Sequence, residues 1–369
     1  MTQSRLFMPL KIGNMDLRCR IAMAPLTRYR AHDDHTPSDL MATYYGQRAS
    51  IPGTLLISEG TFISARAGGY SNVPGIYTES HIEGWRKVTD EVHRNSSYIV
   101  CQLWSLGRAA NPEVAKRENI QILGPSPISI DPKRPVPRQM DHRDIQLMIE
   151  DYAQAARNAI AAGFDAVELH GANGYIIDQF LQTNTNERSD EYGGDVERRS
   201  RFGLEAVRAV IDAVGAKRVG IRLSPWSTFN GMRMEDPIPQ FRYFIRKLSE
   251  LDLAYLHLVE PRIAGNMDVE SADSLDFAIQ EWKNPLLLAG GYVANTARTL
   301  VDEKVPERDV VVTFGRYFIS TPDLPFRIQK GLELTQYDRA TFYTPQKAEG
   351  YVDYAFSKAF LDQQTAEAA

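Results

Sequence analysis

A histidine, an asparagine and a tyrosine directly follow one apolar run. His170, Asn173 and Tyr175 come after residues 165–169 and are interrupted by glycines at positions 171 and 174. An apolar run that ends in polar residues is typical of a buried parallel strand that delivers side chains at its C-terminal end. Imidazole and amide groups can bind one acceptor together, and a phenol, with an ordinary pKa of about 10, can act as a general acid. These residues predict a catalytic site, although a lone histidine is more often structural.

Two further runs end in residues suited to phosphate binding. Gly290 and Gly291 close residues 285–291, and Gly315 and Arg316 close residues 309–316. In barrels, the loops after the last two strands often bind phosphate through backbone N–H groups. Arginine adds bidentate hydrogen bonds to such a group. We therefore favour a bound phosphate over the alternative that these glycines only permit tight turns.

Arg222, Gln102 and His257 lie within or at the end of predicted strands. An inward-facing Arg222 would be a buried cation and would require an anionic or electron-rich ligand, whereas an outward-facing one could pair with a helix carboxylate. Gln102 could bind a heterocycle or satisfy a neighbouring backbone group. His257 has no polar companion in its own strand, so we interpret it as structural.

Metal binding is not predicted. Residues 32–35 hold two histidines and two aspartates, but no third ligand follows at helical or strand spacing, so we expect a solvated loop. Cys19 and Cys101 form no CxxC motif, which excludes a typical zinc site and a disulfide framework.

Strand and helix patterns alternate along the chain, as an α/β barrel requires. One helical pattern ends at residues 44–50. Others lie at residues 81–93, 143–162, 196–214, 238–251 and 295–303. Eight apolar runs lie at residues 20–27, 54–60, 98–103, 165–170, 218–224, 254–260, 285–291 and 309–316. Eight units without a GxGxxG motif predict a closed (β/α)₈ TIM barrel rather than an open dinucleotide-binding sheet, in one domain over residues 1–369.

Two segments do not fit the repeat. Residues 6–20 alternate around Gly13 and Asn14, which predicts an N-terminal β-hairpin that caps the barrel. Residues 103–141, after the third strand, are rich in proline and too long for an ordinary connection. Such insertions usually form lids or binding surfaces, so we expect a lid that contributes to substrate choice.

Composition excludes several classes of protein. The chain has 369 residues, of which 43% are hydrophobic and 24% charged, and a formal net charge of −5. That charge gives no basic field for nucleic acid or an anionic membrane. The N-terminal residues lack the apolar core of a signal peptide, and no run is long enough to span a bilayer. We therefore expect a cytoplasmic protein with no nucleic-acid or membrane partner.

The ordered motifs together resemble the old yellow enzyme family of FMN-dependent ene-reductases. The resemblance covers essentially the whole chain and is closest to fungal members, including the ergot-alkaloid branch. It rests on residues 23–28, 102–104, 170–175, 178–181, 186–194, 222–225, 315–316 and 342–343.

This resemblance implies roles for individual residues. The isoalloxazine ring of FMN would contact Pro25, Thr27, Gly60, Gln102 and Arg222. The FMN phosphate would bind Gly290, Gly291, Gly315 and Arg316. His170 and Asn173 would bind the substrate's oxygen, Tyr175 would protonate its α-carbon, and Tyr70, Trp104, Phe342 and Tyr343 would line the substrate pocket.

The resemblance also implies an activity. NADPH would reduce the bound FMN, and the flavin would then reduce a conjugated enone, enal or nitroalkene in a ping-pong reaction. The enzyme would be a monomer or a homodimer. An alternative keeps the same flavin site for an isomerisation or a net oxidation in secondary metabolism. A protein that only binds flavin is disfavoured, because a pure binder has no need of a proton donor.

Overall fold

The computed structural model describes residues 4–265 and 267–368. Outside the described residues lie 1–3, 266 and 369. The predictions of no signal peptide and of one domain over residues 1–369 include these positions. Within the described ranges, consecutive parallel strands pair around a complete ring, and the last strand pairs with the first. The strands are β3 (Ile21–Met23), β4 (Leu55–Ile57), β6 (Tyr98–Trp104), β9 (Ala166–Gly171), β10 (Val219–Leu223), β11 (Tyr255–Val259), β14 (Leu286–Ala289) and β15 (Val310–Phe314). The prediction of a closed (β/α)₈ barrel is confirmed.

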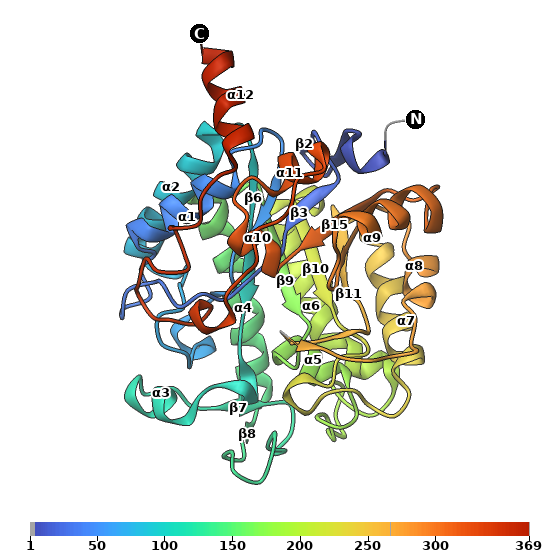
Figure 1. Cartoon of the computed structure of the whole chain (residues 1–369). Coiled ribbons are helices and arrows are strands. Elements are labelled where there is room, and N and C mark those ends of the chain that lie inside the picture. The colour runs from blue at the N-terminus through green and yellow to red at the C-terminus, as the bar shows by residue number, and fades with distance from the viewer. Residues whose placement is uncertain (1–3, 266, 369) are drawn as a thin grey trace.

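Helices surround this barrel (Figure 1). They are α1 (Asp39–Arg48), α2 (Glu79–Arg94), α4 (His142–Ala161), α5 (Ile176–Leu181), α6 (Val196–Val214), α7 (Pro237–Ser249), α8 (Asp276–Glu281), α9 (Ala294–Thr299), α10 (Arg316–Ser320) and α11 (Leu324–Lys330). A reciprocal capping box between Asp141 and Asp144 fixes the start of α4. The short helices α5, α8, α10 and α11 were not predicted, because their five to seven residues carry too little periodic pattern.

A hairpin of β1 (Leu10–Ile12) and β2 (Met15–Leu17) packs its apolar side chains against the lower barrel interior. Its inward residues contact a cluster that includes Leu55, Val100 and Val311. In Figure 1 the hairpin lies at the end of the barrel opposite to the long insertion. One end of the barrel is therefore filled by side chains, and the other end is left for the site.

The insertion after β6 is structured. It contains α3 (Pro112–Arg117) and a parallel pair formed by β7 (Leu123–Gly124) and β8 (Arg138–Gln139). Arg108 joins this insertion to another loop, because its guanidinium donates to Ile128 O at 3.2 Å and to Asn230 O at 3.0 Å. The insertion is thus tied to the connection that follows β10.

The remaining short elements flank the barrel. They are β5 (Thr61–Phe62), the hairpin of β12 (Ile263–Ala264) and β13 (Met267–Asp268), and the C-terminal helix α12 (Lys358–Ala368), which projects from the body in Figure 1. Among the described helices, none has both the length and the apolar character needed to cross a bilayer.

The expectation of a solvated loop at residues 32–35 is wrong for His35. That side chain is only 7% exposed. Its Nδ1 lies 2.7 Å from Val73 O, and its Nε2 lies 3.4 Å from a carboxylate oxygen of Glu118. The histidine therefore anchors the loop to the end of α3, through partners that the local sequence does not reveal.

Candidate active site

A cavity of about 400 Å³ opens at the C-terminal ends of the barrel strands. Its volume lies in the range of small-molecule sites. The structure brings every predicted site residue to its wall: Pro25, Thr27, Gly60, Tyr70, Gln102, Trp104, His170, Asn173, Tyr175, Arg222, Gly290, Gly291, Gly315, Arg316, Phe342 and Tyr343. The cavity is therefore the candidate active site.

The turn that carries Asn173 and Tyr175 is fixed from two sides. The Asn173 N–H donates to Ser224 Oγ at 2.7 Å, just beyond β10. The Gly174 N–H donates to the Asp178 carboxylate at 2.8 Å, from helix α5. Asn173 itself has a positive φ of 57°, which asparagine tolerates better than most residues. The turn is thus preorganised before any ligand binds.

His170 is the last inward-facing side chain of β9. Its Nδ1 accepts the N–H of Ala172 at 3.3 Å. Burial, and then the charge of Arg222, lower the pKa of His170 well below its ordinary value. The ring is therefore neutral at neutral pH, and its hydrogen resides on Nε2. His170 can then donate from Nε2 without carrying a charge.

Tyr175 is enclosed by aromatic rings. Its ring makes edge contacts with Trp104 and with His170, each at a centroid distance of 4.8 Å. Burial, followed by the neighbouring phenols of Tyr70 and Tyr29, raises the pKa of Tyr175 well above its ordinary value. A hydrogen bond with the Asn230 side chain acts in the opposite direction. The phenol keeps its proton throughout the neutral range.

Arg222 and Gln102 form part of the cavity wall, so the interpretation of an outward-facing Arg222 is excluded. The Gln102 amide donates to the Glu168 carboxylate at 2.7 Å. The other Glu168 oxygen lies 2.8 Å from Nδ1 of His257. His257 has no polar companion in its own strand, as expected, but it has a polar partner on β9, across the barrel interior. Its structural role stays a prediction.

The opposite end of the cavity suits a phosphate. Gly290 has φ +157°, and a Cβ there would lie 2.3 Å from the Glu260 side chain. The Arg316 guanidinium makes two 2.6 Å hydrogen bonds to the Asp268 carboxylate of β13. A guanidinium that binds a carboxylate with both of its arms can bind a phosphate in the same way. The donor set therefore fits the FMN phosphate, and the inward Arg222 fits the flavin ring.

Aromatic residues line the mouth. Tyr343 is 44% exposed and lies 5.6 Å from the Tyr29 ring, between centroids. Phe342 is buried, and its carbonyl oxygen accepts hydrogen bonds from Arg28 and Arg30, each at 3.0 Å. Two buried arginines thus hold this C-terminal segment against the site.

The insertion contributes less to the wall than expected. Within the described chain, Trp104 is the only residue of the segment 104–141 that lines the cavity. Arg108 acts indirectly, because it holds the loop that contains Asn230. A role of residues 104–141 in substrate choice remains a prediction.

Four residues near the site were missed. Ser224, Asp178 and Asn230 fix the turn around Tyr175, and Glu168 lies below the cavity. Glu168 could have been found, because it precedes His170 by two positions and must share its face of the strand. Asn230 lies in a loop, and no local signal identifies it.

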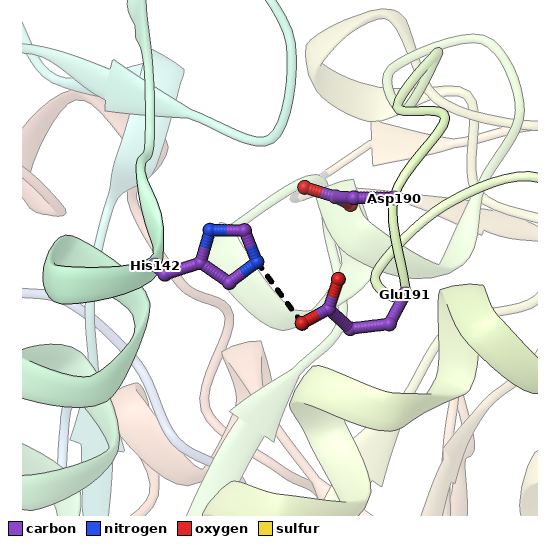
Figure 2. A group of neighbouring side chains, drawn as sticks. All are labelled: His142, Asp190 and Glu191. Carbon is purple, nitrogen blue, oxygen red and sulfur yellow. Dashed lines mark hydrogen bonds and ion pairs between the residues drawn. The ribbon is translucent and has the colours of Figure 1, made fainter.

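One group of possible metal ligands exists elsewhere among the described residues: His142, Asp190 and Glu191 (Figure 2). His142 Nε2 lies 3.0 Å from a Glu191 carboxylate oxygen. Both Asp190 oxygens already accept hydrogen bonds from Arg188, at 3.0 and 2.6 Å. These ion pairs account for the arrangement without a metal.

The chain belongs to the NADH:flavin oxidoreductase / NADH oxidase family, whose model matches residues 5–335. A chanoclavine-I aldehyde reductase of Penicillium roqueforti is 54% identical over 99% of this chain and 100% of that protein. A probable inactive dehydrogenase of Claviceps purpurea is 48% identical over 98% of both chains. An NADP-dependent oxidoreductase of Aspergillus flavus is 46% identical over 97% of this chain and 98% of that protein.

Solved structures agree with this assignment. Old Yellow Enzyme from Pichia sp. superposes with a TM-score of 0.90 at 38% identity, over 96% of this chain and 94% of that chain. Morphinone reductase superposes with a TM-score of 0.88 at 39% identity, over 96% and 97%. The predicted membership of the old yellow enzyme family is confirmed, and the protein is an FMN-dependent oxidoreductase of that family.

Proposed function

We propose that this protein reduces carbon–carbon double bonds conjugated to a carbonyl or nitro group, with NADPH as the hydride donor. One observation carries the proposal: a neutral His170 at the end of β9, and Asn173 and the protonated Tyr175 on the fixed turn that follows it, all lie at the cavity wall. When bound, FMN would supply the hydride chemistry that links NADPH to the β-carbon of the alkene. The protein supplies binding, orientation and the proton.

The cofactor would be held at both ends. Gln102 and Arg222 would contact the flavin ring together with Pro25, Thr27 and Gly60, which also line the cavity. Gly290, Gly291, Gly315 and Arg316 would bind the phosphate. The cationic Arg222 would favour negative charge on the ring, since the surrounding protein screens that charge less than water does.

The substrate's oxygen would accept hydrogen bonds from His170 Nε2 and from the Asn173 side chain. Donors that are already fixed stabilise the negative charge that develops on this oxygen at little cost in reorganisation. Tyr175 would then pass its proton to the α-carbon.

The chemistry of relatives supports a conjugated aldehyde as one substrate class. The Penicillium relative is named an aldehyde reductase, and the aromatic mouth formed by Tyr29, Tyr70 and Tyr343 suits a flat conjugated molecule. The name of the Aspergillus relative supports NADPH. Because one cavity would serve both the donor and the alkene, the two would bind in turn, as a ping-pong mechanism requires.

An anaerobic absorbance experiment tests this proposal. The purified protein is reconstituted with FMN, reduced with NADPH, and then mixed with 2-cyclohexenone or cinnamaldehyde. We expect the flavin bands to bleach with NADPH and to return with the alkene. The expected product is the saturated ketone or aldehyde, identified by gas chromatography.

Two other outcomes would contradict the proposal. If NADPH does not bleach the flavin and NADH does, the assigned hydride donor is wrong. If the bleached flavin is not reoxidised by any conjugated carbonyl or nitro compound, the assigned reaction is wrong and the isomerisation or oxidation alternative gains support. Tyr175→Phe is the matched control, because it should bleach normally and reoxidise slowly.

A further inference from the structure

A layer of polar side chains lies inside the barrel, directly below the cavity floor. Glu168 and His257 are both 0% exposed and do not line the cavity. Glu168 accepts the Gln102 amide at 2.7 Å and contacts Nδ1 of His257 at 2.8 Å. The reaction proposed above uses neither residue. A buried carboxylate without a role in the chemistry requires an explanation, because burying a charge is costly.

Strand register explains why these groups meet. Glu168 is paired with Gln102 of β6 on one side and with Gly220 of β10 on the other. Side chains two positions apart share a face, so Glu168 lies one layer below His170, and Gly220 lies one layer below Arg222. Gly220 leaves room in that layer, because a Cβ there would approach the Tyr255 ring to 2.4 Å. Arg222 itself is in register with His257 of β11. Glu168 thus receives a hydrogen bond from Gln102, and its second partner, His257, lies beside Arg222.

The charges in this layer balance. Burial alone would raise the pKa of Glu168, but His257, Arg222 and Gln102 outweigh burial and lower it. Glu168 is therefore ionised and can only accept hydrogen bonds, so Nδ1 of His257 must be the donor. Burial, opposed by Glu168 and assisted by Arg222, lowers the pKa of His257. Glu168 is thus an anion close to the cation Arg222. The buried phenol of Tyr255 stays protonated, because burial and Glu168 raise its pKa.

We propose that Glu168 and His257 are positioning residues for the flavin. Glu168 orients the Gln102 amide toward the cavity and, as an anion below Arg222, limits the positive field that the reduced flavin experiences. His257 holds the carboxylate in place from β11. The proposal deepens the proposed function and rests on it only through FMN binding.

The sign of the effect follows from the charges. Reduced flavin carries more negative charge than oxidised flavin, so a stronger positive field stabilises the reduced form. Glu168→Gln keeps the shape and one acceptor oxygen but removes the negative charge beside Arg222. The flavin midpoint potential should therefore rise. Glu168→Asp keeps the charge but shortens the side chain, so the hydrogen bond to Gln102 should weaken while the potential changes little.

The test measures the midpoint potential and the FMN dissociation constant of both variants, and it needs no alkene. In Glu168→Gln we expect the potential to rise by about 30 mV, which is a tenfold change for a two-electron couple. In Glu168→Asp we expect the midpoint potential to shift by only a small fraction of this value. The FMN dissociation constant of this variant should rise about tenfold. Asp323→Asn is the matched control, because Asp323 is another fully buried carboxylate, paired with Arg327 at 2.8 Å and away from the cavity wall.

Two results would overturn the proposal. One is an unchanged potential in Glu168→Gln with FMN bound; the other is an equal rise in both Glu168 variants, which would mean that the charge does not matter. If Glu168→Gln does not fold, the Glu168→Asp variant still tests the proposal. An unchanged FMN dissociation constant in Glu168→Asp would contradict the positioning role. A wild-type protein that binds FMN but reduces no alkene would contradict the proposed function alone, because its potential would still report on Glu168.

Discussion

The backbone N–H of Ala172 donates a hydrogen bond to Nδ1 of His170 across 3.3 Å. This contact, two residues along the chain, decides which imidazole nitrogen faces the cavity. Because Nδ1 is an acceptor here, the neutral ring carries its hydrogen on Nε2. A local turn thereby converts an ordinary histidine into an uncharged hydrogen-bond donor for the substrate.

His170→Ala should weaken the binding of ligands whose oxygen enters the cavity. Loss of one buried donor costs about 1–3 kcal/mol, which corresponds to a dissociation constant raised about 5- to 150-fold. Titration of the FMN-loaded protein with 4-nitrophenol, followed by absorbance, measures this change. His93→Ala is a suitable control, because His93 pairs with Asp165 outside the cavity. An unchanged dissociation constant in His170→Ala would show that the oxygen binds elsewhere.

The rate of alkene reduction should be independent of pH above the titration of Asp178, which holds the turn of Tyr175 and whose pKa burial raises to about 7. The pKa of His170 lies well below its ordinary value and that of Tyr175 well above, so neither group changes its protonation state between about pH 6.5 and 10. Stopped-flow reoxidation of pre-reduced protein by 2-cyclohexenone measures the relevant step without NADPH. A change of rate with a midpoint inside this window, above the titration of Asp178, would contradict the prediction if the Tyr175→Phe variant does not show it. It would mean that Tyr175 loses its proton within the window although it is buried.

Tyr175→Phe should separate the two half-reactions. Loss of a positioned general acid typically costs a factor of about 10² to 10⁴, and only alkene reduction needs the proton. Flavin reduction by NADPH should therefore keep its rate, while reoxidation by the alkene slows. Tyr343→Phe, which alters a phenol at the mouth, provides the control and should change neither rate strongly. Slow flavin reduction in Tyr175→Phe would place this residue in NADPH binding instead.

Asn230 should support the proton donor from the neighbouring loop. Its amide donates to Asn173 O at 2.9 Å, and its side chain lowers the pKa of Tyr175 in opposition to burial. Asn230 has φ +56°, so glycine removes the side chain without backbone strain. In Asn230→Gly we expect reoxidation by 2-cyclohexenone to slow about tenfold, with flavin reduction unchanged, because the phenolate that forms loses its donor. Equal rates for the variant and the wild type would show that the turn is held by Ser224 and Asp178 alone.

Local pattern was sufficient to predict the barrel and the residues at its strand ends, whereas the remaining predicted cavity residues followed from the family resemblance: Pro25, Thr27, Gly60, Tyr70, Phe342 and Tyr343. Small or polar residues lie at or just after the ends of several strands, as at His170, Gly290 and Gly315, and a closed barrel brings all such ends to one face. These residues can be predicted although they are far apart in the sequence, because the barrel topology alone brings the strand ends together.

The partners of inward and loop residues could not be predicted in the same way. His257 and Glu168 meet across the barrel interior although 89 positions separate them. Which face of each strand points inward, and which layers then coincide, depends on the register of every intervening strand. His35 similarly depends on Glu118, which the insertion supplies. These contacts are tertiary, and no window of sequence contains both partners.

Arg316 and Asp268 should have opposite effects on FMN binding. Two 2.6 Å hydrogen bonds join them, and Arg316 also lines the cavity where the phosphate is expected. Arg316→Ala should raise the FMN dissociation constant about 10- to 100-fold, since hydrogen bonds to charged groups contribute about 1.5–3 kcal/mol. Asp268→Ala should leave the constant unchanged or lower it, because the carboxylate competes with phosphate for the same guanidinium. Fluorescence titration of the deflavinated protein with FMN measures both. If Asp268→Ala weakens binding as much as Arg316→Ala, the ion pair itself shapes the site, and Asp268 orients Arg316 rather than competing for it.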